Sequence, residues 1–88
     1  MITKIENHIE MNRDRMVQLL QEFLRIPSIS TDPTYKAAIR EAADWVRQRL
    51  ADCGFEVEIV ETDGHPAVLA DSGPIDGQGP TVLVYGHY

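Results

Sequence analysis

The sequence predicts an α/β fold in which two amphipathic helices precede three strands, in the order α-α-β-β-β. Apolar residues recur at helical spacing through the first half of the chain. From residue 55 the pattern changes to alternation, which is the period of a strand. The segment 81–85 is then apolar at nearly every position, as is typical of a strand covered on both faces. Two helices and three strands cover only one face of a sheet, so the sequence indicates the opening of a larger α/β domain.

The first helix is predicted at about residues 4–25. Its apolar residues recur at spacings of three, four and seven, and they are Ile5, Ile9, Met16, Leu20, Phe23 and Leu24. Pro27 disfavours helical backbone at Ile26, so we expect the helix to end near Arg25.

A second helix is predicted at residues 34–53. Asp32 and Pro33 precede it in the arrangement of an N-cap followed by the first helical position. Its apolar face consists of Ala38, Ile39, Ala42, Trp45, Val46, Leu50 and Cys53. We expect the tryptophan and the cysteine of this face to be core residues. Gly54 follows at the position where the C-terminal cap of a helix takes the left-handed conformation.

A β-hairpin is predicted next, followed by a loop. The first strand begins at Phe55, and Val57 and Ile59 share its face. Residues 62–65 predict a turn in which Asp-Gly supplies the backbone freedom that a reversal needs. Residues 66–70 predict a second strand, paired antiparallel with the first. The three glycines and two prolines that follow, at 71–80, predict a loop.

The third strand is predicted at 81–85, and Gly86 and His87 follow it directly. Ligands of open α/β sheets collect beyond the carboxyl ends of the strands. A glycine there lets the backbone turn and approach closely, and a neutral imidazole is a good zinc ligand. His87 is therefore a candidate metal ligand, and an ordinary surface or hydrogen-bonded histidine is the alternative.

Composition and charge argue against several classes of protein. A net charge of −6 over 88 residues argues against nucleic acid or an anionic membrane as a partner, because both need clustered Lys and Arg. No apolar run approaches the roughly 20 residues of a membrane span, and the first residues lack a signal-peptide pattern. Cys53 is the only cysteine, which excludes an intrachain disulfide and suits a reducing compartment. We therefore expect a soluble, cytoplasmic protein.

The remaining candidate residues have plain structural interpretations. His8 fits a solvated or half-buried helix position, and His65 fits a turn residue whose ring caps a loop, with a substrate role as its alternative. Ser28 and Ser30 lie in no Gly-x-Ser-x-Gly elbow, so a serine nucleophile is not supported. The glycines of the 71–80 loop follow no phosphate-loop spacing.

Several segments together resemble one family. The end of the chain, Tyr85-Gly86-His87-Tyr88, is similar to the opening of a Gly-His-(Tyr/Met/Thr)-Asp-Val metal motif. Residues 21–30 resemble a first helix with its Ile-Pro-Ser connector, 35–45 a second helix, and 54–62 a first strand. In this order they resemble the zinc-dependent aminoacylase, carnosine dipeptidase and glutamate carboxypeptidase superfamily, and its dipeptidase branch most of all.

This resemblance implies the N-terminal part of a three-layer zinc-peptidase catalytic domain with a mixed sheet, so that residues 1–88 form one incomplete domain. It implies two zinc ions bridged by a carboxylate and a water, with His87 as a ligand of one zinc. The family's other ligands and its general base match no position here, so no catalytic residue is assigned. The implied substrate is a peptide or an N-acyl amino acid. Members of the family are often homodimers through a domain inserted further along the chain.

We accordingly expect the N-terminal portion of a dipeptidase or carboxypeptidase, cut just after its first metal-binding histidine. By itself it should neither hydrolyse peptides nor hold zinc tightly, because a zinc site needs three or four protein ligands. An alternative is a small non-catalytic binding or assembly module that docks through its last strand by strand addition. A third is a structural domain without a ligand, for which the unprotected apolar strand favours aggregation.

Overall fold

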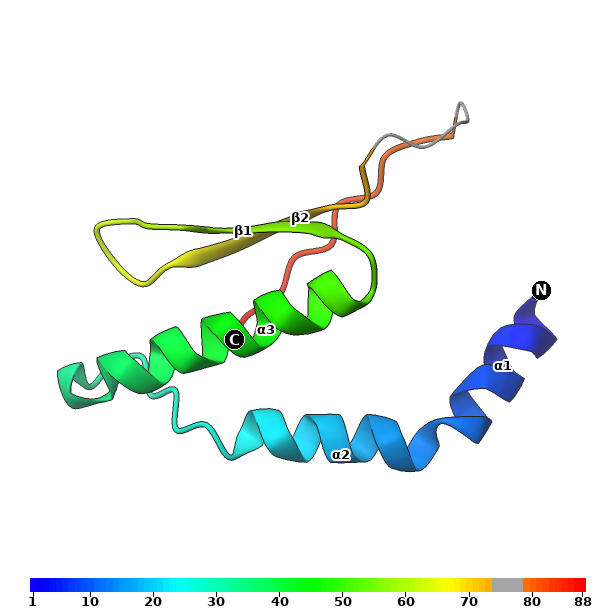
Figure 1. The fold of residues 1–88 in the computed structure, drawn as a ribbon, viewed down its shortest axis with the longest axis horizontal. Coiled ribbons are helices and arrows are strands. Elements are labelled where there is room, and N and C mark those ends of the chain that lie inside the picture. The colour runs from blue at the N-terminus through cyan, green and yellow to red at the C-terminus, as the bar shows by residue number, and fades with distance from the viewer. Residues whose placement is uncertain (74–78) are drawn as a thin grey trace.

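The computed structural model describes residues 1–73 and 79–88, so part of the predicted loop at 71–80 lies outside the described residues. The elements in chain order are α1 (Ile2–Met11), α2 (Arg13–Leu24), the 3₁₀ helix η1 (Pro33–Tyr35), α3 (Lys36–Asp52), β1 (Glu56–Val60) and β2 (Ala67–Asp71). Helix α3 lies along a hairpin of the two strands, and α2 runs on the other side of α3 (Figure 1). The fold is therefore α/β, with a small antiparallel sheet. No helix of the described residues is long and apolar enough to span a membrane.

The predicted first helix is two helices, because the chain breaks at Asn12. Its side-chain amide donates to the His8 carbonyl oxygen at 2.8 Å, and its backbone N–H bonds the same oxygen at 3.1 Å. An asparagine that bonds nearby backbone groups competes with the helical pattern, and α2 starts anew one residue later. The prediction of one continuous helix is wrong at this point. The end of the second half is confirmed, since α2 stops at Leu24 with Arg25 as its C-cap.

Asp32 caps the 3₁₀ turn that leads into α3, whose own N-cap is Tyr35, and Gly54 follows the helix end as predicted. The Asp32 carboxylate accepts hydrogen bonds from the backbone N–H of Thr34 at 3.0 Å and from its hydroxyl at 2.8 Å. The first turn after this cap is the 3₁₀ helix η1, which leads directly into α3. Gly54 follows the helix with a φ of 93°, the left-handed conformation in which glycine is favoured.

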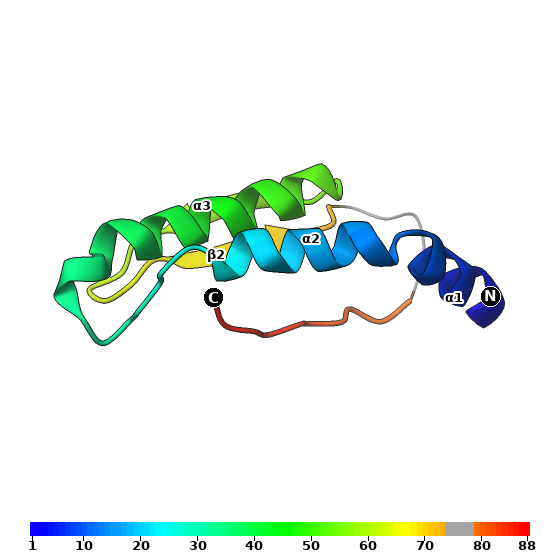
Figure 2. The same ribbon diagram turned by 90° about the horizontal axis from the view of Figure 1, so that it is seen from below.

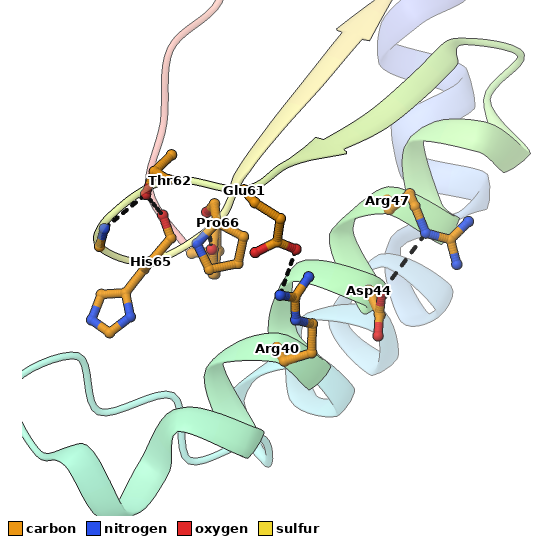
Figure 3. A network of polar contacts seen from close by, with 9 residues as sticks. Arg40, Asp44, Arg47, Glu61, Thr62, His65 and Pro66 are labelled. Atoms are coloured by element: carbon orange, nitrogen blue, oxygen red, sulfur yellow. Dashed lines mark hydrogen bonds and ion pairs between the residues drawn. The ribbon is translucent and has the colours of Figure 1, made fainter.

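The hairpin of β1 and β2 confirms the predicted antiparallel pair. Val57 lies opposite Ala70, and Ile59 lies opposite Val68. The turn differs from the prediction, since only Gly54 and Gly73 have positive φ among the described residues, and the Asp-Gly glycine does not. The Thr62 hydroxyl holds the reversal instead (Figure 3): it donates to the His65 carbonyl oxygen at 2.7 Å and accepts from the Gly64 N–H at 3.0 Å.

The predicted third strand at 81–85 is wrong for this structure. Residues 79–88 take no regular secondary structure, and β1 and β2 are the strands that the described residues form. The apolar side chains of the segment are exposed, with Leu83 at 90% and Val84 at 87%. An apolar strand is stable when a neighbouring strand satisfies its backbone groups and other layers cover its faces. The two-stranded sheet supplies neither, so α-α-β-β-β and the mixed sheet are not what the described residues build.

The core is small and comes from α3. Within residues 1–73 and 79–88 the buried apolar residues are Ile39, Ala42 and Ala43, and α3 packs on both strands. Phe23 of α2 meets Trp45 of α3 with ring centroids 5.1 Å apart, so the tryptophan is half-buried, in partial agreement with the prediction. Cys53 is exposed, contrary to the prediction, because it is the C-cap residue at the end of α3 rather than part of its packed face.

Much apolar surface is left uncovered. The accessible surface is 7525 Å², whereas a compact monomer of 9.9 kDa exposes about 5,200 Å². Along α1 and α2 the exposed large apolar residues are Ile2, Ile5, Ile9, Met11, Met16, Val17, Leu20 and Leu24. The apolar stripe that predicted the first helix is thus available to pack against further protein surface.

Candidate functional site

Four parts of the chain meet around one hollow of about 220 Å³. Its lining comes from the connector after α2 (Ser28, Ser30), from α3 (Ile39), from the hairpin turn (His65, Pro66) and from the chain end (Gly86, His87, Tyr88). Figure 2 shows how this is possible, because the last residues run back from the loop in the direction of the hairpin turn. The hollow is where the sequence-predicted candidates His65 and His87 come together.

His65 ties the hairpin turn to the connector. Its ring points away from the turn (Figure 3), and Nε2 lies 2.9 Å from the Ser30 carbonyl oxygen. A carbonyl oxygen only accepts, so Nε2 carries the proton of this hydrogen bond. The ring therefore caps a loop, as the sequence predicts. Ser30 takes part through its backbone, and nothing in this contact activates its hydroxyl.

Tyr88 ties the chain end to the same turn. Its hydroxyl donates to the Pro66 carbonyl oxygen, and the ring is half-buried. Partial burial raises the pKa of the Tyr88 phenol; the charge of Arg40 lowers this pKa and the charge of Glu61 raises it. Arg40 and Glu61 form an ion pair with each other, from α3 to the start of the turn (Figure 3). Sequence reasoning missed Tyr88, because neither periodicity nor motif spacing reports a contact that spans 22 residues.

His87 is exposed beside the hollow, and its ring contacts an aromatic ring of its own segment. The Tyr85 ring meets it edge-on, with centroids 5.1 Å apart at 84°. The sequence predicts that a strand at 81–85 carries this histidine, and this prediction is wrong for the structure, in which residues 79–88 form no strand. His87 is carried instead by an irregular segment whose next residue, Tyr88, is anchored.

Comparisons with known proteins give a consistent set of relatives. A cysteinylglycine-S-conjugate dipeptidase of Corynebacterium striatum is 33% identical over 78 residues, which cover 88% of this chain and 17% of the relative. Cys-Gly metallodipeptidases of Candida albicans and Schizosaccharomyces pombe are 30% and 29% identical, over 91% and 99% of this chain. The predicted resemblance to the dipeptidase branch of the metallopeptidases is confirmed.

The chain spans about a fifth of the length of these metallodipeptidases, whose matched shares are 17%, 19% and 20%. No protein-family model matches the sequence. No solved structure gives a significant match either.

The described residues do not fit a complete metal centre of a metallodipeptidase. In residues 1–73 and 79–88, no group of three or more His, Cys, Asp or Glu side chains is placed to hold a metal ion. His65 donates its Nε2–H to the Ser30 carbonyl, and His87, the ligand that the sequence predicts, lines the same hollow. His8 belongs to α1, where the Asn12 side-chain amide lies 3.5 Å from its Nδ1. A zinc site needs three or four protein ligands, which these histidines do not supply together.

Proposed function

We propose that this chain forms the N-terminal part of the catalytic domain of a metal-dependent dipeptidase. The observation that carries the proposal is the similarity to metallodipeptidases over 88–99% of the chain. The proposed substrate is a dipeptide, in keeping with the names of those relatives, and the wider family's N-acyl amino acids are the second choice. The reaction class is hydrolysis of a peptide or amide bond.

The proposal includes a two-zinc centre in a three-layer domain, with His87 as one ligand. Its support is the Gly-His pair and the position of His87 at a hollow that four parts of the chain line. The other ligands and the general base would come from protein outside these 88 residues. The described residues by themselves therefore neither hydrolyse dipeptides nor bind zinc tightly. Homodimerisation, which is common in the family, would likewise need a domain that these residues do not include.

A chimera tests the function. The chain replaces the matched 78 residues of the Corynebacterium striatum relative, and hydrolysis of a cysteinylglycine S-conjugate and bound zinc are measured. We expect hydrolysis within about tenfold of the parent enzyme, and His87→Ala should remove most activity and lower the zinc content. His8→Ala, an exposed histidine of α1, is the matched control and should change neither. A folded chimera that keeps its zinc and activity after His87→Ala contradicts the proposed ligand.

Isothermal titration of the 88-residue chain with zinc is the second test. A stoichiometric site with a submicromolar Kd would contradict the proposed division of ligands, because such affinity requires a complete ligand set.

A non-catalytic binding module is the second candidate, and one observation favours it. Residues 82–85 form an exposed apolar segment, with Val82 at 78% and Leu83 at 90%, which a partner's sheet edge would accept by strand addition. Light scattering coupled to size-exclusion chromatography separates the candidates. A concentration-dependent dimer that is lost in Leu83→Asp supports docking by this segment, and a stable monomer contradicts it.

A further inference from the structure

The segment that carries His87 has one described tie to the rest of the fold. Residues 79–87 are exposed and form no regular secondary structure. The contact between the Tyr85 and His87 rings lies within the segment, so it cannot fix the segment to anything else. In the described part of the chain, the hydrogen bond that joins 79–88 to the fold is the one from the Tyr88 hydroxyl to the Pro66 carbonyl oxygen.

The acceptor of that hydrogen bond is itself held in place from several sides. Glu61, at the start of the turn, is paired with Arg40 of α3. His65, next to Pro66, bonds the connector through the Ser30 carbonyl oxygen at 2.9 Å. The Thr62 hydroxyl closes the turn internally. Pro66 therefore presents a carbonyl whose position is fixed relative to both α3 and the connector.

We propose that Tyr88 is a positioning residue, whose hydroxyl bond to the Pro66 carbonyl holds the His87 imidazole at the hollow beside the connector and the hairpin turn. The catalytic role of this positioning rests on the proposed function, in which His87 is a metal ligand. Histidines that bind metals need outer contacts to fix their orientation, and loss of such contacts typically weakens metal affinity by about 10- to 100-fold. Here the contact is made by the adjacent residue rather than by the imidazole itself.

Deletion of the hydroxyl tests the anchor in the 88-residue chain. NMR relaxation gives the order parameter of the His87 backbone N–H, for which about 0.85 is rigid and below about 0.6 is flexible. We expect a rigid value in the wild type, a value below about 0.6 in Tyr88→Phe, and no change in Tyr85→Phe. Tyr85 is the matched control, because it loses the same hydroxyl from an exposed ring in the same segment. A flexible His87 in the wild type, or a rigid one in Tyr88→Phe, overturns the anchor.

A pH titration of the wild type repeats this test without a substitution, should Tyr88→Phe lose its helix content by circular dichroism. A phenolate cannot donate a hydrogen bond, so His87 should become flexible as Tyr88 ionises. The other titratable groups around the anchor are Arg40, Glu61, His65 and His87. A His87 that stays rigid after Tyr88 ionises overturns the anchor in the same way.

Zinc binding by variants of the chimera separates this inference from the proposed function. In the chimera, Tyr88→Phe should raise the Kd for zinc by about 10- to 100-fold, and Tyr85→Phe should leave it unchanged. If His87→Ala weakens zinc binding and Tyr88→Phe does not, the positioning role is overturned and the proposed ligand stands. If His87→Ala leaves zinc binding unchanged, the proposed ligand fails, and the order parameters still decide whether Tyr88 anchors the segment.

Discussion

Asp32 makes the turn that leads into α3 depend on pH. The Thr34 backbone N–H, and after it the Thr34 hydroxyl, hold the pKa of the Asp32 carboxyl below its usual range. A carboxyl whose pKa is lower in the folded state stabilises the fold above its unfolded pKa of about 4 and loses that contribution as the pH falls through the folded value. We therefore expect acid to loosen the start of α3.

The measurement is the melting temperature by circular dichroism between about pH 6 and pH 2. Asp32→Asn is the control, because the amide oxygen still caps the helix but does not titrate in this range. The wild type should lose more stability than the variant on acidification. Parallel curves for the two proteins would contradict the role assigned to the carboxylate.

Tyr88 gives the opposite dependence at alkaline pH. Burial raises the pKa of its phenol, and Glu61 adds to the shift while Arg40 opposes it. A group with a raised folded pKa contributes stability that is complete below its unfolded pKa of about 10 and is lost as the pH rises through the folded value. Phenolate absorbance follows the ionisation of the three tyrosines as the pH rises. The transition that Tyr88→Phe removes should lie above the ordinary tyrosine pKa. If the transition that the variant removes lies at the ordinary tyrosine pKa, the partly buried environment of Tyr88 is contradicted.

The candidate site was predictable in part at the level of residues. His87 was found from the Gly-His pair after an apolar segment, and His65 from its place in a turn. Tyr88 was not found, because its partner is a backbone carbonyl 22 residues away that belongs to no motif. Local sequence patterns report which residues can bind, and the chain path decides which of them meet.

At the scale of elements, local signals predicted local structure well. Asp32 and Gly54 mark the two ends of the helical region around α3, and alternation from residue 55 marks the hairpin. The break at Asn12 was missed, because the apolar stripe continues across it while the side-chain amide interrupts the backbone pattern. The strand at 81–85 was predicted from its apolar composition, yet strand formation depends on a neighbour that no local pattern supplies.

Gly54→Ala tests the left-handed cap that links α3 to β1. The φ of 93° is unfavourable for alanine, and an added Cβ would meet nothing within 4 Å, so the cost comes from the backbone alone. We expect a loss of about 1–2 kcal/mol in the free energy of unfolding by urea. Gly64→Ala is the matched control, since Gly64 lacks a positive φ and its added Cβ would lie 3.8 Å from the Thr62 hydroxyl, an ordinary contact. Equal losses in both variants would contradict the strain argument.

At the scale of the whole molecule, stability depends on very few buried side chains. Ile39 is 3% exposed, and its buried apolar companions are the two alanines Ala42 and Ala43. Ile39→Ala should cost about 2–5 kcal/mol, which approaches the entire stability expected of a domain this small. We expect loss of the cooperative thermal transition, while Ile39→Val, at about 0.5–1.5 kcal/mol, should keep it. A cooperative transition in Ile39→Ala near the wild-type temperature would show that the stability lies elsewhere.

The uncovered apolar segment at 81–85 leads to a prediction about context. No backbone hydrogen bond joins it to the other residues that the structure describes, and its side chains face solvent. In the chimera, a neighbouring strand and a second layer would pair the segment's backbone groups and cover those side chains, so the segment should become the third strand that its composition favours. Hydrogen exchange should show the amides of Val82 and Val84 nearly unprotected in the 88-residue chain and protected at least about 100-fold more in the chimera. The amides of β1 and β2 should be protected in both proteins and serve as the internal reference. An active chimera in which residues 82–84 still exchange freely would contradict the predicted strand and mean that His87 reaches a metal from an irregular segment.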